Sequence, residues 1–499
     1  MKFDGKGREE LAITNKVSIG GPVTAFGELA AAEVTPQVQI GFPYNLNEQI
    51  IETRDNGGSS TVSGGLASMS TGAGANQSAT ILSKTPVKYN HGQGGLFRGT
   101  AIFTTGVANS TQQIGIGDSF DGYFFGYEGA TFGIKRLDSG KPEVRTLTVT
   151  TGSSTAENIT ITLDDDALAT VAVTNTGDVT LTANEIAAAD YSTTGSGWFT
   201  EAVGDTVIFV SWNDGAKSGA YTLSSASTAV GTFAQDLAGV TTTSTAVAQT
   251  AWNVDTMDGS GPSGITLDPT KGNVYQIRYQ WLGFGMMTFG IQDSDVGAFQ
   301  TVHQIKYANS NTIPSVQNPT LPICVQAKNT SNTSDMVIKT ASLAGFTEGR
   351  DEELGVMTGA SAQNTGVTST EIPILSVRSK VVFQSVLNRS KIKILTGTVS
   401  TDATKTISIR VLINPTLTGS SWADLSTNTS VVQTDTTATA CAGGTEVFVF
   451  NMGKTDTQIV DVSGLGMYLL PGSHMTITAA AVSGTGHDVT IATNWRELL

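Results

Sequence analysis

The feature that most constrains the fold of this chain is an alternation of apolar and polar residues with a period of two. In residues 274–281, one face of an extended segment would carry Tyr, Ile, Tyr and Trp, and the other would carry Gln, Arg and Gln. Glycines at 283 and 285 interrupt this pattern, and it restarts with Met287, Phe289 and Ile291. Alternation of this kind is typical of a half-buried β-strand, and two such runs around a glycine turn predict a β-hairpin.

Shorter alternating runs recur along the chain, separated by clusters of Gly, Ser, Thr and Asn. They lie at residues 96–105, 122–134, 147–150, 159–163, 171–174, 206–212, 407–413 and 447–450. A helical turn is indicated at residues 183–189, where alanines surround Asn184 and Glu185. Many short strands with frequent turn residues predict an all-β fold built from several β-sandwich or jelly-roll domains.

The acidic residues are concentrated in one quarter of the chain. Residues 146–270 contain 14 Asp and Glu residues against one base, Lys217, and so account for −13 of the net charge of −15. The segments on either side share an aromatic, glycine-rich pattern, so we expect a small acidic β-domain inserted into a larger β-domain. An acidic surface repels phosphate, and we therefore expect no nucleic-acid partner.

These patterns divide the chain into five parts. Pro36 and Pro43 bracket an alternating run near the N-terminus, which suits an edge strand or an extended arm. The expected parts are an N-terminal assembly arm (1–50), a discontinuous jelly-roll-like sandwich (51–145 plus 251–350), an inserted acidic β-domain (146–250), a linker (351–370) and a C-terminal β-sandwich (371–499).

The cysteines and the lengths of the apolar runs argue against a disulfide-rich protein and against a membrane-spanning protein. Cys324 and Cys441 match no metal-binding spacing, so we expect two buried thiols rather than a disulfide framework. We find no run of about 18 apolar residues and no apolar secretion signal, so we expect neither membrane insertion nor signal-directed export. With 14 % charged residues and many Gly, Ser and Thr, the surface is expected to be neutral and hydroxylated.

Several blocks of the sequence resemble a widespread family of structural proteins from phages and large viruses. The most specific block begins with WNVD at residues 252–255 and DGSGPSG at 258–264. The remaining blocks are GEL (27–29), QVQIGFPYN (37–45), DGYFFG (121–126), LDP (267–269), GNVYQI (272–277), QWLG (280–283), His303, YAN (307–309), QNP (317–319) and LP (321–322). The resemblance covers roughly residues 25–350.

The resemblance implies a virion-associated, jelly-roll-like β-protein, and it supplies no catalytic residue and no cofactor. We therefore predict a virion structural protein, specifically a tail-fibre or appendage subunit that contributes to particle assembly and host attachment. Such a subunit would be a homo-oligomer, with a trimer expected, and would contact other tail or capsid proteins. It would be made in the host cytoplasm and released within the virion by lysis.

Two alternatives stay open at this point. The first is a capsid decoration or cement protein, which would be present in hundreds of copies per particle where an appendage is present in tens. The second belongs to another class and is a carbohydrate-binding or glycan-cleaving module with a host surface glycan as its partner.

The sequence gives little support to an enzyme. A glycosidase needs two carboxylates across a cleft, but Asp close to Gly commonly accepts hydrogen bonds within its own turn. His303 lies in a strand-like run and is expected to be structural. The aspartates at 164–166 suit a solvated hairpin tip better than a calcium loop. The candidate acid pairs, all interpreted as turn residues, are Asp118/Asp121, Asp255/Asp258 and Asp293/Asp295.

Aromatic side chains beside polar turns are the best candidates for a sugar site. Trp198 and Trp212 in the acidic segment could stack on a sugar ring, with Asn213 and Asp214 bonding its hydroxyl groups. A Trp in a small sandwich also commonly belongs to the core. We name these four residues as possible glycan-binding residues, and we expect no catalytic, cofactor-binding or metal-binding residue.

Overall fold

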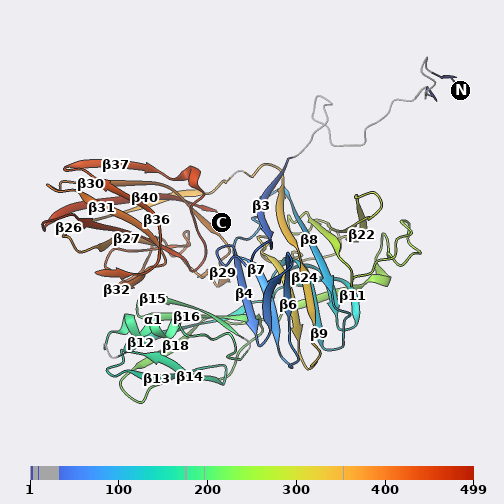
Figure 1. Cartoon of the computed structure of the whole chain (residues 1–499), viewed down its shortest axis with the longest axis horizontal. Coiled ribbons are helices and arrows are strands. Elements are labelled where there is room, and N and C mark those ends of the chain that lie inside the picture. Colours follow the sequence, from blue (N-terminus) through green and yellow to red (C-terminus); the bar gives the residue numbers. More distant parts are fainter. Residues whose placement is uncertain are drawn as a thin grey trace.

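The computed structural model describes residues 33–174, 177–195, 197–351 and 353–498, together with the short strands β1 (Lys2–Phe3) and β2 (Glu9–Glu10). Strands make up 56 % of the described residues and helices 3 %, which confirms the all-β prediction. The described residues form three β-sandwiches (Figure 1). We call them the large sandwich (33–141 and 240–351), the insert (142–239) and the C-terminal sandwich (356–498).

The large sandwich consists of two sheets that contain strands from both sides of the insert. One sheet has seven strands in the order β19-β11-β10-β9-β23-β7-β4. The other has nine strands, in the order β22-β21-β20-β8-β24-β6-β5, with β25 pairing with β3 and β8. The strands of the first sheet are β4 (Ile51–Asn56), β7 (Ser78–Ser83), β9 (Ser110–Gly117), β10 (Gly122–Glu128), β11 (Thr131–Asp138), β19 (Thr243–Ala248) and β23 (Ile323–Asn329). Those of the second are β3 (Val34–Gly41), β5 (Ser59–Ser63), β6 (Leu66–Ser70), β8 (Gly94–Phe103), β20 (Asn273–Tyr279), β21 (Met287–Gln292), β22 (Phe299–Ile305), β24 (Val337–Thr340) and β25 (Ser342–Glu348).

The core of the large sandwich is aromatic. The predicted hairpin is confirmed as β20 paired with β21, with Tyr275 opposite Ile291. Phe125 of β10 lies between the sheets, with ring centroids 5.0 Å from Tyr275 and 5.4 Å from Phe289. Side chains from before and after the acidic segment thus bury one another, and that segment contributes no ring to these contacts.

The insert is a small sandwich with one helix against it. Its sheets have the strand orders β15-β16-β12-β18 and β14-β13-β17. Leu147, Val207 and Phe209 are fully buried between them. The elements are β12 (Pro142–Thr151), β13 (Glu157–Leu163), β14 (Asp166–Val173), α1 (Val179–Ala187), β15 (Trp198–Val203), β16 (Thr206–Asp214), β17 (Tyr221–Ser224) and β18 (Val230–Leu237).

The helix of the insert begins earlier than residues 183–189, where the sequence indicates it. Asp178 is its N-cap, and the carboxylate accepts a hydrogen bond from the backbone N–H of Leu181 at 3.0 Å. An Asp at this position satisfies one of the backbone N–H groups left open at a helix start. Ala183 and Ile186 face the core of the insert, so burial as well as capping stabilises this helix.

The chain enters and leaves the insert at one point. Lys141 and Val240 are paired there by two backbone hydrogen bonds of 3.0 Å, each N–H donating to the carbonyl of the other. Residues 243–248 are predicted from the sequence to belong to the insert, but they form β19 and pair with β11 of the large sandwich. These residues are Thr, Ser, Ala and Val, like many residues of the insert, so composition does not separate them from it. Their pairing with β11, which is distant in sequence, assigns them to the large sandwich. A short 3-10 helix, η1 (Gln249–Ala251), follows.

The C-terminal sandwich packs a five-stranded sheet on a six-stranded sheet. The first has the order β26-β40-β30-β37 with β38 beside β30, and the second has the order β33-β34-β27-β39-β31-β36. Two further two-stranded sheets belong to it, the hairpin β28-β29 and the pair β32-β35. The elements are β26 (Val356–Val367), β27 (Ile372–Ser379), β28 (Val382–Phe383), β29 (Val386–Leu387), β30 (Lys391–Thr401), β31 (Ile407–Ile413), β32 (Thr416–Thr418), β33 (Ala423–Asp424), β34 (Val432–Asp435), β35 (Ala440–Ala442), β36 (Thr445–Met452), β37 (Asp456–Asp461), η2 (Ser463–Leu465), β38 (Tyr468–Leu469), β39 (His474–Ala481) and β40 (His487–Leu498).

Two expectations about connecting segments need correction. Within the expected arm (1–50), residues 34–41 form β3, an edge strand of the large sandwich, and Val38 and Ile40 are buried in its core. Most of residues 1–32 lies outside the described residues. Within the expected linker (351–370), residues 356–367 form β26, because small residues such as Ala360 and Ala362 alternate inward against the C-terminal sandwich.

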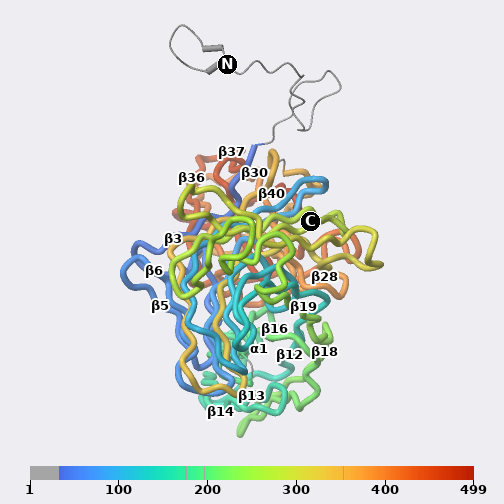
Figure 2. Tube along the Cα trace, turned by 90° about the vertical axis from the view of Figure 1, so that its right-hand side faces the viewer, coloured from blue at the N-terminus to red at the C-terminus, as the bar shows by residue number. Residues whose placement is uncertain are grey.

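The three sandwiches are joined by buried contacts. Arg389, after the β28-β29 hairpin, forms ion pairs with Asp118 (2.5 Å) and Asp121 (3.6 Å) of the large sandwich. Figure 2, turned by 90°, shows the insert at the lower end of the molecule and the C-terminal sandwich behind the upper part of the large one. Within the part of the chain that the structure describes, no helix is long and apolar enough to cross a membrane.

Candidate functional site

Trp198, the first of the possible glycan-binding residues, belongs to the core of the insert. Its side chain is 3 % exposed, and its ring meets Tyr221 edge-on with centroids 6.1 Å apart. A ring buried in this way has no face open to a ligand, so Trp198 stabilises the insert.

Trp212, Asn213 and Asp214 lie together at the joint between the insert and the large sandwich. Trp212 packs on Gly197 and lines a cavity of about 10 Å³, which is too small for a sugar ring. The Asn213 side-chain oxygen accepts a hydrogen bond from Lys328 Nζ at 3.2 Å, and Asp214 accepts one from the backbone N–H of Thr242 at 2.5 Å. The structure therefore brings these three residues together but uses them to fix the insert in place.

The acid pairs occupy turns. Asp255 accepts hydrogen bonds from the backbone N–H groups of Met257 and Ser263, both at 2.9 Å, and Asp258 accepts one from Ser260 at 2.9 Å. Asp293 likewise accepts one from the backbone N–H of Asp295 at 2.7 Å. These bonds are the turn role that the sequence favours for aspartates near glycine.

The pair Asp118/Asp121 has an additional role that the sequence does not reveal, because both carboxylates hold Arg389 of the C-terminal sandwich. Burial raises the pKa of Asp121 to about 6, although the Arg389 guanidinium opposes this shift. The pair is therefore a joint between two sandwiches.

The remaining sequence candidates are also structural in the described residues. His303 is 7 % exposed, its Nδ1 accepts a hydrogen bond from the backbone N–H of Asn253 at 3.2 Å, and burial lowers its pKa. Asp164 and Asp165 form a hairpin tip and accept hydrogen bonds from Gly219 and Ala220, both at 2.8 Å. Among the residues with a described position, no group of three or more His, Cys, Asp or Glu side chains could hold a metal ion.

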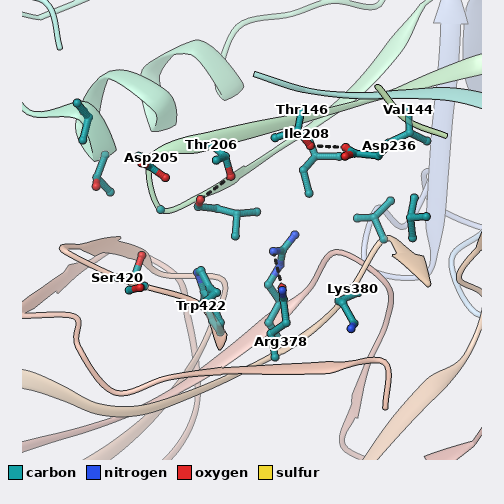
Figure 3. Close-up of a pocket in the computed structure, with 18 of the residues that line it drawn as sticks. Val144, Thr146, Asp205, Thr206, Ile208, Asp236, Arg378, Lys380, Ser420 and Trp422 are labelled. Atoms are coloured by element: carbon teal, nitrogen blue, oxygen red, sulfur yellow. Dashed lines mark hydrogen bonds between the residues drawn. The ribbon is translucent and has the colours of Figure 1, made fainter. Parts of the chain in front are cut away.

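A large open cleft with a volume of about 760 Å³ lies between the insert and the C-terminal sandwich (Figure 3). This volume falls within the range of about 300–1,000 Å³ that is usual for small-molecule sites, which commonly lie between domains. We call it the inter-sandwich cleft. Its lining residues are Val144, Thr146, Val179, Thr180, Val203, Gly204, Asp205, Thr206, Ile208, Asp236, Arg378, Lys380, Val381, Val382, Gly419, Ser420, Ser421, Trp422 and Gln433.

The insert supplies one wall of the cleft with the outer face of its four-stranded sheet. Because side chains alternate along a strand, Leu147 and Phe209 point into the core of the insert while Thr146 and Ile208 point outward into the cleft. Asp236 of β18 lies beside Thr146, whose hydroxyl donates a hydrogen bond to its carboxylate. Asp205, in the turn between β15 and β16, is exposed at the rim.

The C-terminal sandwich supplies the opposite wall. Arg378 at the end of β27 points up from this wall toward the insert, as Figure 3 shows. Trp422 lies in the turn before β33 and is half-buried. Its ring meets the His474 ring edge-on, with centroids 5.7 Å apart, and the Arg378 guanidinium lies over the indole at 5.9 Å from the ring centroid. Trp422 is therefore fixed at the cleft by these two contacts without being packed into a core.

Arg378 is the most buried polar group of the cleft, with 3 % of its side chain exposed. Its Nε donates to Glu201 Oε1 and its Nη1 donates to Gln433 Oε1, both at 3.2 Å. Its Nη2 is buried and finds no partner among the described residues. A buried donor without an acceptor costs free energy, so this nitrogen marks a place where a ligand oxygen would be stabilising.

Glu201 of β15, in the insert, is the ion-pair partner of Arg378. Burial raises its pKa to about 7, while the charge and the hydrogen bond of Arg378 oppose this shift. A second contact between the two walls is apolar, where Val144, Val210 and Leu237 of the insert pack on Val381 next to the β28-β29 hairpin. The walls of the cleft are thus held at fixed spacing by one polar and one apolar contact.

Arg378 and Trp422 are not among the site residues predicted from the sequence. Each has a signal in the sequence, since an arginine interrupts an apolar strand at 372–379 and a tryptophan follows the polar turn Gly419-Ser420-Ser421. A charged residue within a buried strand requires a partner, but the sequence does not show that this partner is Glu201, 177 residues away.

No family model matches this sequence, and no curated protein matches it. Among solved structures, peanut lectin bound to a 9mer peptide is 9 % identical, covering 63 % of this chain and 98 % of its own length, with a TM-score of 0.27. The CBM2 module of the evolved Dit of Lactobacillus casei BL23 phage J-1 is 8 % identical, covering 65 % and 100 %, with a TM-score of 0.27. A lectin from Bauhinia forficata in complex with GalNAc is 8 % identical, covering 63 % and 99 %, with a TM-score of 0.25. At these scores the similarities carry no argument about the cleft.

Proposed function

We propose that this chain is an attachment subunit of a virus particle, an appendage protein that binds a saccharide of the host surface in the inter-sandwich cleft. The observation that carries the proposal is the lining of that cleft. It sets an indole ring, a buried guanidinium with an unpaired donor and two carboxylates around one space of about 760 Å³. An apolar surface with a few convergent polar groups is the general pattern of a small-molecule site.

The chemistry of a pyranose matches this lining. The C–H face of the sugar would stack on Trp422, since an aromatic face is apolar and weakly negative. Hydroxyl groups would accept from Arg378 and donate to the carboxylates on the opposite wall, and hydrogen bonds to charged groups are the stronger ones. The proposed role is binding rather than catalysis.

The virion part of the proposal is supported by the sequence resemblance over roughly residues 25–350. That region spans the large sandwich and the insert, and so includes one wall of the cleft. The other wall belongs to the C-terminal sandwich, which the resemblance does not cover. We propose that the large sandwich and the N-terminal residues contact other particle proteins and sister subunits of a homo-oligomer, with a trimer expected. The opposite side of the molecule would then present the cleft.

A glycan array probed with the labelled full chain tests the binding function. We expect binding to a defined set of glycans, and we expect Trp422→Ala to weaken it by about tenfold or more through the loss of the stacking face. Trp212→Ala is the matched control, because Trp212 lies at the other joint of the insert. Binding that survives Trp422→Ala, or no binding to any glycan, would overturn the assignment to this cleft.

The particle role is tested by quantitative mass spectrometry of purified virions. An appendage is expected in tens of copies in multiples of three, whereas hundreds of copies would identify a decoration protein and overturn the appendage proposal. Removal of residues 1–32, which leaves β3 in place, is expected to abolish incorporation while the purified protein keeps its thermal unfolding temperature. Normal incorporation of the truncated chain would remove the N-terminal residues from the proposed interface.

A further inference from the structure

We infer that the ligand of the inter-sandwich cleft is a neutral saccharide, one without carboxylate, sulfate or phosphate groups. This inference rests on the proposed binding function and assigns its ligand class. The observations that carry it are the sign and the pairing of the charged groups in the lining.

The cations of the lining are already paired within the protein. Arg378 forms an ion pair with Glu201 at 3.2 Å, and Lys380 forms one with Asp424 at 3.1 Å. Both cations are largely buried, with 3 % and 14 % of their side chains exposed. An acidic ligand would have to compete with carboxylates that are fixed in place, and displacing one would leave a buried charge uncompensated.

The insert faces these cations with carboxylates that have no cationic partner among the described residues. Asp205 is exposed at the rim, and Asp236 accepts a hydrogen bond from the Thr146 hydroxyl. An anionic sugar in the cleft would lie near both carboxylates, and like charges at short range repel even at an effective dielectric constant of about 20. The net charge of −15 for the whole chain adds to this repulsion at longer range.

A neutral sugar has hydroxyl groups that can form hydrogen bonds with both the cationic and the anionic groups of this lining. A hydroxyl oxygen would accept from Arg378 Nη2, which is buried and unpaired. Hydroxyl hydrogens would donate to Asp205 and Asp236, because ionised carboxylates accept and do not donate. Hydroxyl groups both donate and accept, so a single sugar ring could satisfy the donor on one wall and the acceptors on the other while its C–H face covers Trp422.

The test compares neutral and acidic glycans on one array, with sialylated, sulfated, uronic-acid and phosphorylated glycans as the acidic arm. The wild-type chain is expected to bind the neutral arm. Each of Asp205→Asn and Asp236→Asn is expected to weaken neutral binding by about tenfold, because each removes a hydrogen bond to a charged acceptor. Asp205 is exposed, so its replacement leaves the fold intact, and thermal unfolding of each variant checks this.

Charge reversal provides the sharper readout. In the double variant Asp205→Lys and Asp236→Lys, we expect the ratio of neutral to acidic binding to fall by about tenfold or more, as cations replace anions at the rim. The matched control is the double variant Asp165→Lys and Asp190→Lys, which makes the same charge change at two exposed positions of the same insert outside the cleft lining. A ratio that changes equally in the control would assign the effect to net charge and overturn the inference.

The possible failures are distinguishable. Wild-type binding confined to acidic glycans and lost in Trp422→Ala would overturn the neutral-ligand inference and leave the binding function standing. Absence of binding to both arms would overturn the binding function itself, and the inference with it.

Discussion

At the scale of single residues, the Arg378–Glu201 pair makes the stability of the protein depend on pH. The pKa of Glu201 in the folded protein is about 7, above its usual value of about 4.3 in an unfolded chain. The folded protein therefore holds this proton more tightly, so the stabilisation is complete below the unfolded pKa and is lost as the pH rises through 7.

We expect Glu201→Gln to flatten this dependence, because the amide stays neutral at every pH. The difference in unfolding free energy between wild type and variant should change by at most about 1.4 kcal/mol per pH unit between pH 5 and 7. Thermal or denaturant unfolding at several pH values measures it. A constant difference in favour of wild type across this range would show that Glu201 is ionised throughout and that our account of the pair is wrong.

At the scale of elements, glycines allow strands of the large sandwich to approach closely. A Cβ atom on Gly126 in β10 would lie 1.9 Å from the backbone oxygen of Gln112 in β9. We expect Gly126→Ala to destabilise the protein by about 3 kcal/mol, the upper end for overpacking, because a backbone atom cannot move aside. Gly397 in β30 is the matched control, since its nearest neighbour would be 3.9 Å away. Equal unfolding temperatures for the two variants would refute this packing argument.

The residues just before and within the β28-β29 hairpin connect the C-terminal sandwich to the insert. Val381 is 6 % exposed and packs on Val144, Val210 and Leu237, so Val381→Asp would bury an unpaired charge at this contact. We expect the insert and the C-terminal sandwich to separate, seen as a larger radius of gyration in small-angle scattering and as faster proteolysis between them. Val386→Asp, in the same hairpin but 48 % exposed, should leave both unchanged. An unchanged radius for Val381→Asp would show that other contacts suffice.

The elements also show what the sequence can predict. Strands with strong alternation, such as β20 and β21, are predicted correctly because their own sequence alternates between buried apolar and outward polar residues. β26 is missed because its inward residues are small or polar, and β19 is misplaced because only its pairing with β11 assigns it to the large sandwich. The cleft could not be predicted for the same reason, since Glu201 and Arg378 are brought together by the docking of two sandwiches.

At the scale of the whole molecule, the insert is a separable unit. Its ends are joined by the two hydrogen bonds between Lys141 and Val240, and β11 and β19 pair directly beyond them. We expect a chain in which two glycines replace residues 142–239 to keep the large sandwich folded, measured by circular dichroism and a cooperative thermal transition. The same chain should bind no glycan, because one wall of the cleft is gone. Failure of the shortened chain to fold would show that the insert supports the large sandwich.

The single point of entry also has a consequence for how such a protein changes over generations. Residues 142–239 are one uninterrupted stretch of coding sequence, and they carry one complete wall of the cleft. A recombination event with one crossover at each end would exchange that wall in a single step, without altering any strand of the large sandwich. One wall of the proposed saccharide site could therefore be replaced as a block, while the parts that we propose join the protein to the particle keep their sequence.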